Sequence, residues 1–267
     1  MNMIGRTTRK RYYEDPYLTR CPAHVVRSGG DYIELDSTVA YPEGGGQESD
    51  RGLIHLPDGR RVRFVEAKRM YGYAPRLEGF PDIQVDGVIW HVIHPDDRSV
   101  AAGIKEGTPV GVEIDVERRA RLTLSHTASH LVYVGIGLYR PDAIPGILGC
   151  HIKPEGARFD FKVAERFTPE DVEAITAFAN DLVCRDAPVR VEPHAVHADA
   201  RIWRCEAHQM PCGGTHLAST GSIGPLKVRR KCLGAGKERL SCEFVDAALD
   251  LMPYQRPDAT VPPGADS

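Results

Sequence analysis

The sequence predicts an α+β fold, because two kinds of hydrophobic pattern succeed one another near residue 115. Before that point, short segments rich in β-branched and aromatic residues are separated by turns, which is typical of a small β-barrel or sandwich. Beyond it, two long stretches with helical periodicity alternate with strands. We therefore expect a β domain over 1–115, an α+β domain over 116–250 and a disordered tail over 251–267.

Five segments of the first domain are predicted strands. Most of them alternate between apolar and polar residues, and glycine and aspartate at 29–31 and 57–59 supply turn chemistry between them. The predicted strands are 32–35, 52–56, 61–65, 88–93 and 110–114.

Two helices are predicted in the second domain. Asp115 is a plausible N-cap for a helix over 116–139, which contains no proline and ends before Pro141. Thr168 and Pro169 resemble the N-cap and first residue of a second helix, which runs to about residue 184. Further strands are predicted at 158–161, 189–192, 225–232 and 240–245, the last two joined by the glycine-rich turn 234–236. The proline-rich segment after residue 253 predicts the disordered tail.

Composition sets limits on the class of protein. The chain has 267 residues, 42% hydrophobic and 27% charged, with a net charge of −3, as in a globular protein without strong general attraction to nucleic acid. It contains neither a membrane-spanning apolar stretch nor the apolar core of a secretory signal at its start. Seven scattered cysteines predict reduced thiols rather than a disulfide framework. We expect a cytoplasmic protein with neither a membrane nor an obligate protein partner.

Two short motifs predict a metal site. His126 and His130 are four residues apart in the first predicted helix, so their imidazoles share a face. Cys212 and His216 flank two glycines, which allow the loop to turn tightly. Together these residues offer four nitrogen and sulfur donors, the ligand set that Zn²⁺ favours in tetrahedral sites. A metalloprotease motif is excluded, because Thr127 stands where that motif needs a glutamate.

A third motif is glycine-rich and lies at 42–47, with the sequence Pro-Glu-Gly-Gly-Gly-Gln. Two interpretations are open. The segment is either a flexible hairpin turn or a backbone held close to a ligand, because a chain without Cβ atoms lets amides approach phosphate or ribose.

These three motifs, in this order, resemble the alanyl-tRNA editing proteins of the AlaX type and the editing domain of alanyl-tRNA synthetase. The likeness covers roughly residues 38–245 and is most specific at 212–216. The chain shows no core for amino-acid activation, so the resemblance implies a free-standing editing factor. The matching positions are 42–47, Asp50, Gly52, His126, His130, 212–216, 220–221 and 223–225.

The resemblance implies a β-barrel packed against an α+β editing domain with zinc in its cleft. The implied activity is hydrolysis of the ester in mischarged tRNA(Ala), chiefly Ser-tRNA(Ala) and also Gly-tRNA(Ala). His126, His130, Cys212 and His216 would bind the zinc ion. The glycines Gly44, Gly45 and Gly46 and the side chain of Gln47 would face the acceptor end of the tRNA.

Selectivity for serine requires a partner for its hydroxyl group. Ser129 is suitably placed beside the metal-binding histidines, and Cys150 or His151 are alternatives. Thr215 also offers a hydroxyl near the substrate, although hydrogen bonding within the loop is its simpler role.

Contacts with the acceptor stem must be local, given the slightly negative net charge. The strand carrying Lys227, Arg229 and Lys231 is the first choice, and the basic groups at 6–11 and 118–121 are other candidates. Two further functions stay open: a metal-stabilised tRNA-binding module without hydrolysis, and an editing enzyme for another mischarged tRNA such as Ser-tRNA(Thr).

Overall fold

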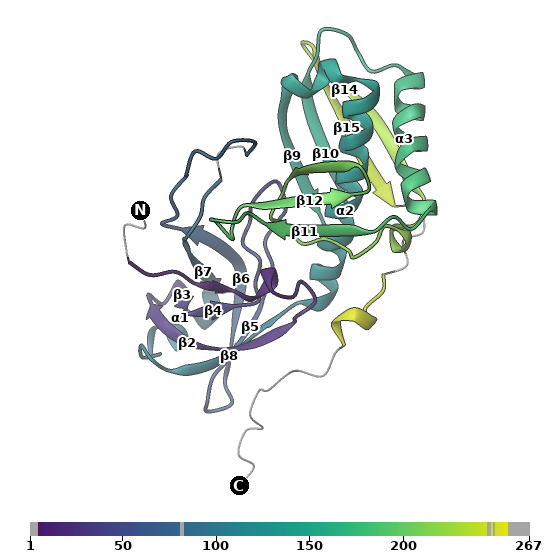
Figure 1. Cartoon of the computed structure of the whole chain (residues 1–267). Coiled ribbons are helices and arrows are strands. Elements are labelled where there is room, and N and C mark those ends of the chain that lie inside the picture. The colour runs from purple at the N-terminus through teal and green to yellow at the C-terminus, as the bar shows by residue number, and fades with distance from the viewer. Residues whose placement is uncertain (1–4, 81–82, 245–246, 248, 256–267) are drawn as a thin grey trace.

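Six strands from the first part of the chain close into a barrel (Figure 1). The computed structural model describes residues 5–80, 83–244, 247 and 249–255. Neighbouring strands are antiparallel, and side chains alternate between the barrel interior and its surface. The predicted β-barrel is confirmed. In spatial order the strands are β2 (Arg20–Ser28), β3 (Tyr32–Leu35), β7 (Val88–Ile93), β6 (Arg61–Met70), β5 (Gly52–His55) and β8 (Pro109–Ile114).

Strand β2 is absent from the strands predicted from the sequence. It contains Pro22, and proline cannot donate a hydrogen bond to the neighbouring strand. The first half of β2 pairs only with β8 and the second half only with β3, so Pro22 has one paired side. The alternation of buried Cys21, Ala23 and Val25 then decides the conformation.

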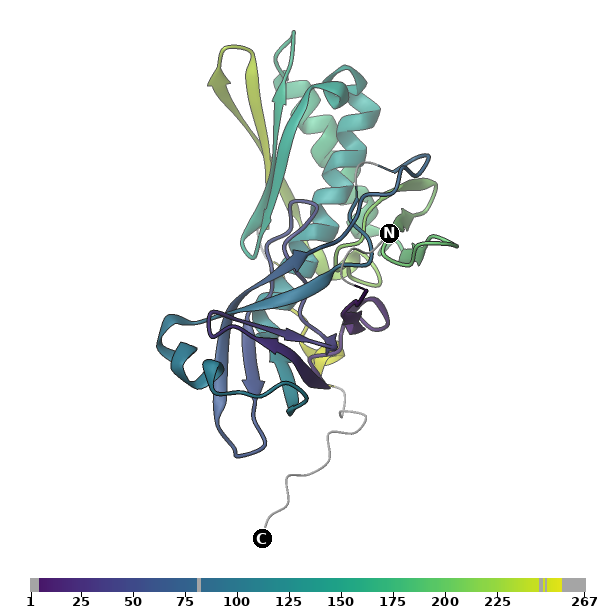
Figure 2. The same ribbon diagram turned by 90° about the vertical axis from the view of Figure 1, so that its left-hand side faces the viewer.

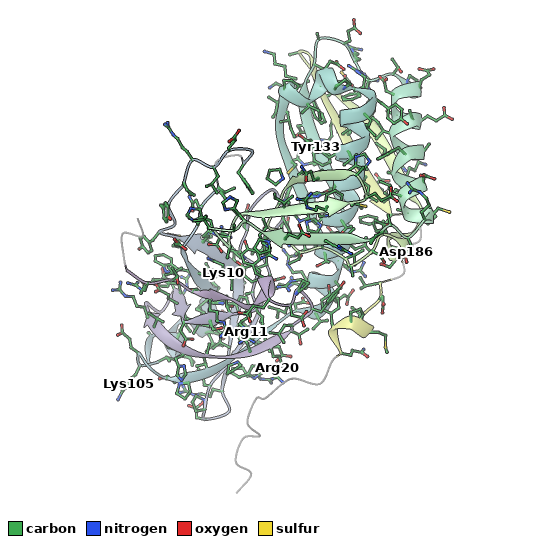
Figure 3. The ribbon with its side chains drawn as sticks, viewed as in Figure 1. Lys10, Arg11, Arg20, Lys105, Tyr133 and Asp186 are labelled. Atoms are coloured by element: carbon green, nitrogen blue, oxygen red, sulfur yellow. The ribbon has the colours of Figure 1, made fainter. Side chains whose placement is uncertain are left out.

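Short elements extend the barrel toward the second domain. Strand β1 (Arg9–Lys10) pairs in parallel with β4 (Ser37–Thr38) and leads into the 3-10 helix η1 (Arg11–Tyr13). Lys10 consequently lies at the level where the two domains meet (Figure 3). On the other side of the barrel, η2 (Pro95–Asp97) and α1 (Arg98–Ala102) precede β8.

Both predicted helices are confirmed. Helix α2 (Val116–Tyr139) begins at Asp115, whose side chain accepts a hydrogen bond from the Arg118 amide. Helix α3 (Pro169–Cys184) begins at Thr168, which forms a reciprocal capping box with Asp171. Local capping residues therefore predicted both starts correctly.

The two helices cover one face of a four-stranded antiparallel sheet, and the other face is bare (Figure 2). Apolar residues such as Ile152, Phe159, Leu240 and Val228 point into the helix-covered face. Strand β9 was not among the predicted elements, although the other three were. The spatial order is β14 (Leu226–Gly234), β15 (Lys237–Phe244), β10 (Gly156–Lys162) and β9 (Ile147–Lys153).

A smaller three-stranded sheet lies across α2 from the opposite side (Figure 1). Its central strand buries Trp203, which packs on the His130 ring with centroids 4.7 Å apart. Only the first of its strands was predicted. The strands are β11 (Val189–Pro193), β12 (Arg201–Cys205) and β13 (His208–Pro211), and the 3-10 helices η3 (Pro141–Gly146) and η4 (Gly221–Ile223) complete the domain.

The predicted tail begins with ordered structure rather than disorder. The 3-10 helix η5 (Met252–Tyr254) buries Tyr254, whose ring packs against Tyr17 with centroids 5.1 Å apart. An aromatic side chain thus holds these residues to the body of the protein, and the rest of the tail lies outside the described residues. None of the described helices has the length and apolar character needed to span a membrane.

Candidate metal centre

Helix α2 positions two of the four predicted ligands. His126 and His130 lie one turn apart, both buried, with ring centroids 4.8 Å apart. They share a face because residues four apart on a helix are neighbours. The helix therefore presents both imidazoles to the same point, as the sequence spacing predicted.

The loop after β13 supplies the other two ligands. The Cys212 amide donates to the Arg201 carbonyl at 2.9 Å, which fixes the start of the loop against β12. A Cβ atom at Gly214 would lie only 2.1 Å from Cε1 of His126. Glycine at this position is therefore required for the loop to approach the helix.

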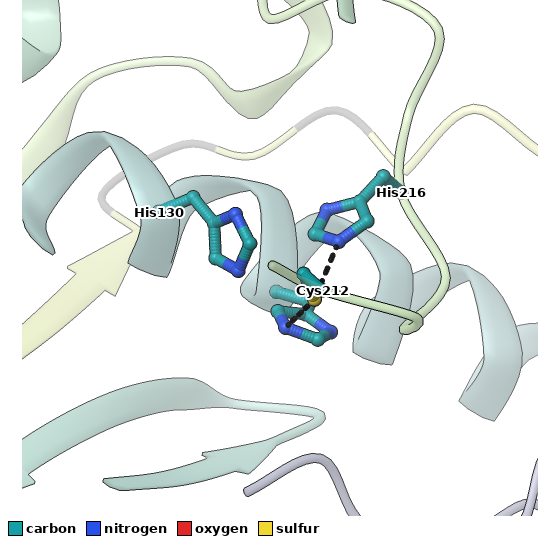
Figure 4. Close-up of side chains that lie close together, drawn as sticks. His130, Cys212 and His216 are labelled. Atoms are coloured by element: carbon teal, nitrogen blue, oxygen red, sulfur yellow. Dashed lines mark hydrogen bonds between the residues drawn. The ribbon is translucent and has the colours of Figure 1, made fainter. Parts of the chain in front are cut away.

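The four side chains converge on one point (Figure 4). Their ligand atoms all lie within 4.8 Å of one another, and the Cys212 sulfur lies 3.4 Å from Nε2 of both His126 and His216. A tetrahedral zinc ion with bonds of 2.0 to 2.3 Å needs ligand atoms roughly 3.3 to 3.8 Å apart. The two sulfur-to-nitrogen distances fall in this range, and the donor types suit a metal ion.

Burial sets the protonation state of these groups. It lowers the pKa of His126 to about 3 and holds the pKa values of His130 and His216 well below the usual range, where neighbouring imidazoles lower them further. Neutral imidazole is the form that binds metal. Burial also raises the pKa of the Cys212 thiol to about 12, so metal binding would release its proton.

Gln47 supports the centre from the barrel side. It was predicted to face the end of an RNA, but its side chain is fully buried. Its Oε1 accepts from His126 Nδ1 at 2.6 Å and from the Thr215 amide at 3.2 Å. This arrangement leaves Nε2 of His126 free to bind metal. Around metal sites, a hydrogen bond to the other ring nitrogen typically fixes the orientation of a histidine ligand.

The two predicted hydroxyl groups are both turned to internal partners. Thr215 accepts hydrogen bonds from Thr123 at 2.9 Å and from Gln47 Nε2 at 3.1 Å. These bonds match the simpler role predicted for Thr215 from the sequence, hydrogen bonding that holds the loop. Ser129 is buried and donates to the His126 carbonyl at 2.7 Å. It lies outside the lining of the cavity described next.

A cavity of about 740 Å³ opens onto the metal centre. It is lined by His126, His130 and Cys212 from the centre and by Gly44, Gly45 and Gly46 from the glycine-rich loop. Sequence reasoning missed other lining residues, among them Arg69, Arg201 and Tyr13. Nothing in their spacing marks them, because the cavity forms only when the barrel and the second domain come together.

The glycine-rich loop makes a tight turn beside this cavity. The amides of Gly44 and Gln47 each bond to the other residue's carbonyl. Gly46 has a φ of +85°, and a Cβ atom there would lie 2.2 Å from the Cys150 sulfur. The turn is therefore held against β9, which places its glycines at the cavity wall.

The predicted RNA contacts fall on different surfaces. Lys227, Arg229 and Lys231 are exposed on β14, on the bare face of the sheet. In the group at 118–121, Arg119 is fully buried and bonded to Asp50, while Arg118 and the exposed Arg121 are paired with Glu48 and Glu117.

The basic N-terminal group is also engaged within the protein. Lys10 pairs with Asp199 at 2.5 Å, and Arg9 pairs with Glu14 at 2.7 Å. Cys205 and His208, which lie close upstream of Cys212, pair with each other across β12 and β13 and are not part of the metal cluster among the described residues.

Similarity to known proteins agrees with these features. No protein-family model matches the chain. It is 31% identical over 268 residues to the alanine–tRNA ligase of Methanopyrus kandleri, a match that covers 91% of this chain and 27% of that protein. The alanine–tRNA ligases of Metallosphaera sedula and Thermofilum pendens are 32% and 33% identical, over 83% and 84% of this chain and 24% of each relative.

The chain thus spans about a quarter of the length of the curated relatives it matches. Identity at this level extends over most of its own length, through both the barrel and the metal centre. The resemblance drawn from the three motifs is confirmed: this chain is a homologue of the alanine–tRNA ligases.

Proposed function

We propose that this protein hydrolyses the ester of mischarged tRNA(Ala), chiefly Ser-tRNA(Ala) and also Gly-tRNA(Ala). The observation that carries the proposal is the convergence of His126, His130, Cys212 and His216 at a cavity walled by the glycine-rich loop. Homology to alanine–tRNA ligases supports a substrate built on tRNA(Ala). The partner would be the acceptor stem of that tRNA, in the cytoplasm.

The metal we assign to the centre is zinc. Three imidazoles and one thiolate are borderline-soft donors that suit Zn²⁺. The ion would supply positive charge that polarises or orients a group of the aminoacyl ester. Gln47 holds His126 in the tautomer that this role requires.

Hydrolysis of the ester does not require a strong general base from the protein. An aminoacyl ester is already reactive, so positioning and stabilisation of developing charge can supply the acceleration. Gly44, Gly45 and Gly46 border the cavity, and the Tyr41 hydroxyl steadies this loop by donating to the Gly44 carbonyl at 3.2 Å. We assign to these glycines the contact with the terminal nucleotide.

The bare face of the four-stranded sheet supports contact with an RNA backbone. Arg229 is paired with Glu243, and Arg158 and Arg239 are both paired with Asp160. Lysines add charge that is not paired within the described part of the chain, which would attract phosphates locally despite the net charge of −3. They are Lys227 and Lys231 on β14, Lys237 on β15, Lys162 on β10 and Lys153 on β9.

A deacylation assay tests the proposal. Purified zinc-loaded protein is incubated with Ser-tRNA(Ala), Gly-tRNA(Ala), Ala-tRNA(Ala) and Ser-tRNA(Thr), with and without a chelator. We expect ester loss from the first two alone, and only without chelator. Stable esters in every arm would instead favour a tRNA-binding module, and cleavage confined to Ser-tRNA(Thr) would assign a different tRNA.

A ligand variant connects the activity to the centre. Cys212→Ala should lower bound zinc and deacylation together, because a tetrahedral site loses its only thiolate. The matched control is Cys184→Ala, which changes an exposed cysteine on α3 and should alter neither quantity. Full zinc content in Cys212→Ala would remove this residue from the ligand set.

A further inference from the structure

The cavity holds two guanidinium groups that the metal centre does not use. Arg69 is the penultimate residue of β6 in the barrel, and Arg201 is the first residue of β12 in the second domain. Both line the cavity together with the metal ligands. Arg201 is tied directly to the centre, because its carbonyl accepts the Cys212 amide at 2.9 Å.

Tyr13 brings the two arginines together. The Arg201 guanidinium lies over the Tyr13 ring, 4.8 Å from its centroid, and Arg69 Nη2 donates to the Tyr13 hydroxyl at 3.4 Å. Backbone carbonyls hold the other side of each group: Gln84 accepts from Arg69 at 2.5 Å and Val191 accepts from Arg201 at 2.9 Å. The planes are thus oriented before any ligand arrives.

Neither guanidinium has a carboxylate within ion-pair distance among the residues that the structure describes. One of the acidic residues that line the cavity is Asp199. It is paired with Lys10 at 2.5 Å, and both side chains are less than a tenth exposed. The other two lining acids are Glu66, paired with Lys68, and the exposed Glu43.

Burial of positive charge without an anion carries a cost. Asp199 is the acidic group that acts on both arginines, but it is itself paired with Lys10, so neither guanidinium has an ion pair of its own among the described residues. A ligand that brings negative charge into the cavity would offset this cost, and the planar guanidinium fork matches phosphate geometry.

We propose that Arg69 and Arg201 form a phosphate subsite for the terminal nucleotide of the RNA whose ester reaches the metal centre. This inference rests on the proposed function for the identity of the ligand. The phosphodiester and the ester are attached to the same ribose, and the cavity lies in the size range of small-molecule sites. Holding the phosphate would therefore set where the ester lies, so both arginines act as positioning residues.

Binding of adenosine 5′-phosphate and of adenosine to the zinc-loaded protein, measured by calorimetry, tests the subsite without requiring hydrolysis. We expect the phosphate to improve affinity, and Arg69→Gln or Arg201→Gln to weaken binding of adenosine 5′-phosphate by about tenfold to a hundredfold. Binding of adenosine should change little. Equal affinity of the wild-type protein for both ligands, or equal losses for both in the variants, would overturn the proposal.

Matched controls separate the subsite from a structural role. Arg63→Gln on β6 and Arg204→Gln on β12 change exposed arginines that are paired with Asp97 and Glu192. They should bind both ligands like the wild type. Bound zinc should also be unchanged in Arg201→Gln, because the bond to Cys212 uses the backbone carbonyl.

Kinetics distinguishes failure of the subsite from failure of the proposed function. With 3′-seryl-adenosine and its 5′-phosphate as substrates, the variants should raise KM for the phosphorylated ester alone, with little change in kcat. If the wild-type protein cleaves neither ester, the hydrolytic function is wrong and the binding measurement still decides the subsite. If it cleaves both with variant KM values unchanged, the subsite is wrong and the function stands.

Discussion

At the scale of single residues, Gln47 shows how a glycine-rich motif can serve a metal centre. Its side chain lies inside the protein, accepts from His126 and bonds to Thr215. The glycines before it allow the tight turn that carries it inward. The motif therefore has two roles: its glycines line the cavity and its last side chain holds the ring of His126.

Removal of the Gln47 amide should weaken the metal site. Gln47→Ala leaves His126 Nδ1 without its acceptor, and loss of such a contact typically lowers metal affinity about tenfold to a hundredfold. Competition with a chromogenic chelator measures the zinc affinity. Glu48→Ala is the matched control, because Glu48 bonds to Arg118 and His151 instead of a ligand. Equal affinities in the two variants would contradict this role.

His91 makes the barrel sensitive to acid. It is fully buried, its Nδ1 faces the Ile33 carbonyl at 3.1 Å, and burial lowers its pKa to about 4 from a usual 6.5. Between those values the unfolded chain binds a proton here and the folded barrel does not, so stability falls as the pH is lowered. This residue alone should cost about 2 kcal/mol between pH 7.5 and pH 5.

Urea unfolding of metal-free protein at the two pH values measures this contribution. His91→Asn should reduce the difference in unfolding free energy between them. The exposed His24 serves as the control, because His24→Asn should leave the difference as in the wild type. An unaltered difference in His91→Asn would show that this histidine is not the source.

At the scale of elements, the sequence predicted the helices that local signals define and missed strands that depend on pairing with distant strands. Helices α2 and α3 were predicted because their N-caps, Asp115 and Thr168, lie beside them in the chain. Strands β9 and β12 are stabilised by neighbours that only the fold supplies, and β9 exposes Ile147 and Leu148 without clear alternation. Their existence depends on partners that periodicity does not reveal.

The same distinction applies to the candidate site. The convergence of the four candidate ligands was predictable because each pair is four residues apart, on one helix and in one loop. The contact of Gln47 with His126 spans 79 residues, and Arg69 and Arg201 meet at Tyr13 from two different sheets. Such contacts leave no regular spacing in the sequence, so the surroundings of the candidate metal centre were the part that could not be predicted.

At the scale of the whole molecule, the site exists because two domains are fixed against each other. The barrel provides the glycine-rich loop and Gln47, and the second domain provides the four candidate ligands. A buried ion pair between Asp50 and Arg119 crosses this junction, and Arg119 also donates to the carbonyls of Pro16 and Val39. Asp50 in turn accepts from the Tyr41 amide at 2.7 Å, at the start of the glycine-rich motif.

Breaking this pair should therefore weaken both the fold and the metal site. Arg119→Met leaves Asp50 buried without its cation, a change that typically costs about 3 to 5 kcal/mol of unfolding free energy. The control is Arg121→Met on the same helix, whose exposed pair with Glu117 is worth only a few tenths of a kcal/mol. Urea unfolding measures the stability, and chelator competition measures zinc retention.

The change in zinc retention tests whether the contact between the two domains organises the metal site. If the Asp50–Arg119 pair sets the position of Gln47 through the glycine-rich loop, Arg119→Met should lose zinc more readily than the wild type at urea concentrations where both proteins are still folded. Replacing both partners, as Asp50→Asn with Arg119→Met, removes the unpaired charge and should recover part of the stability. Full zinc retention in a clearly destabilised Arg119→Met would mean that the second domain holds its metal without the barrel.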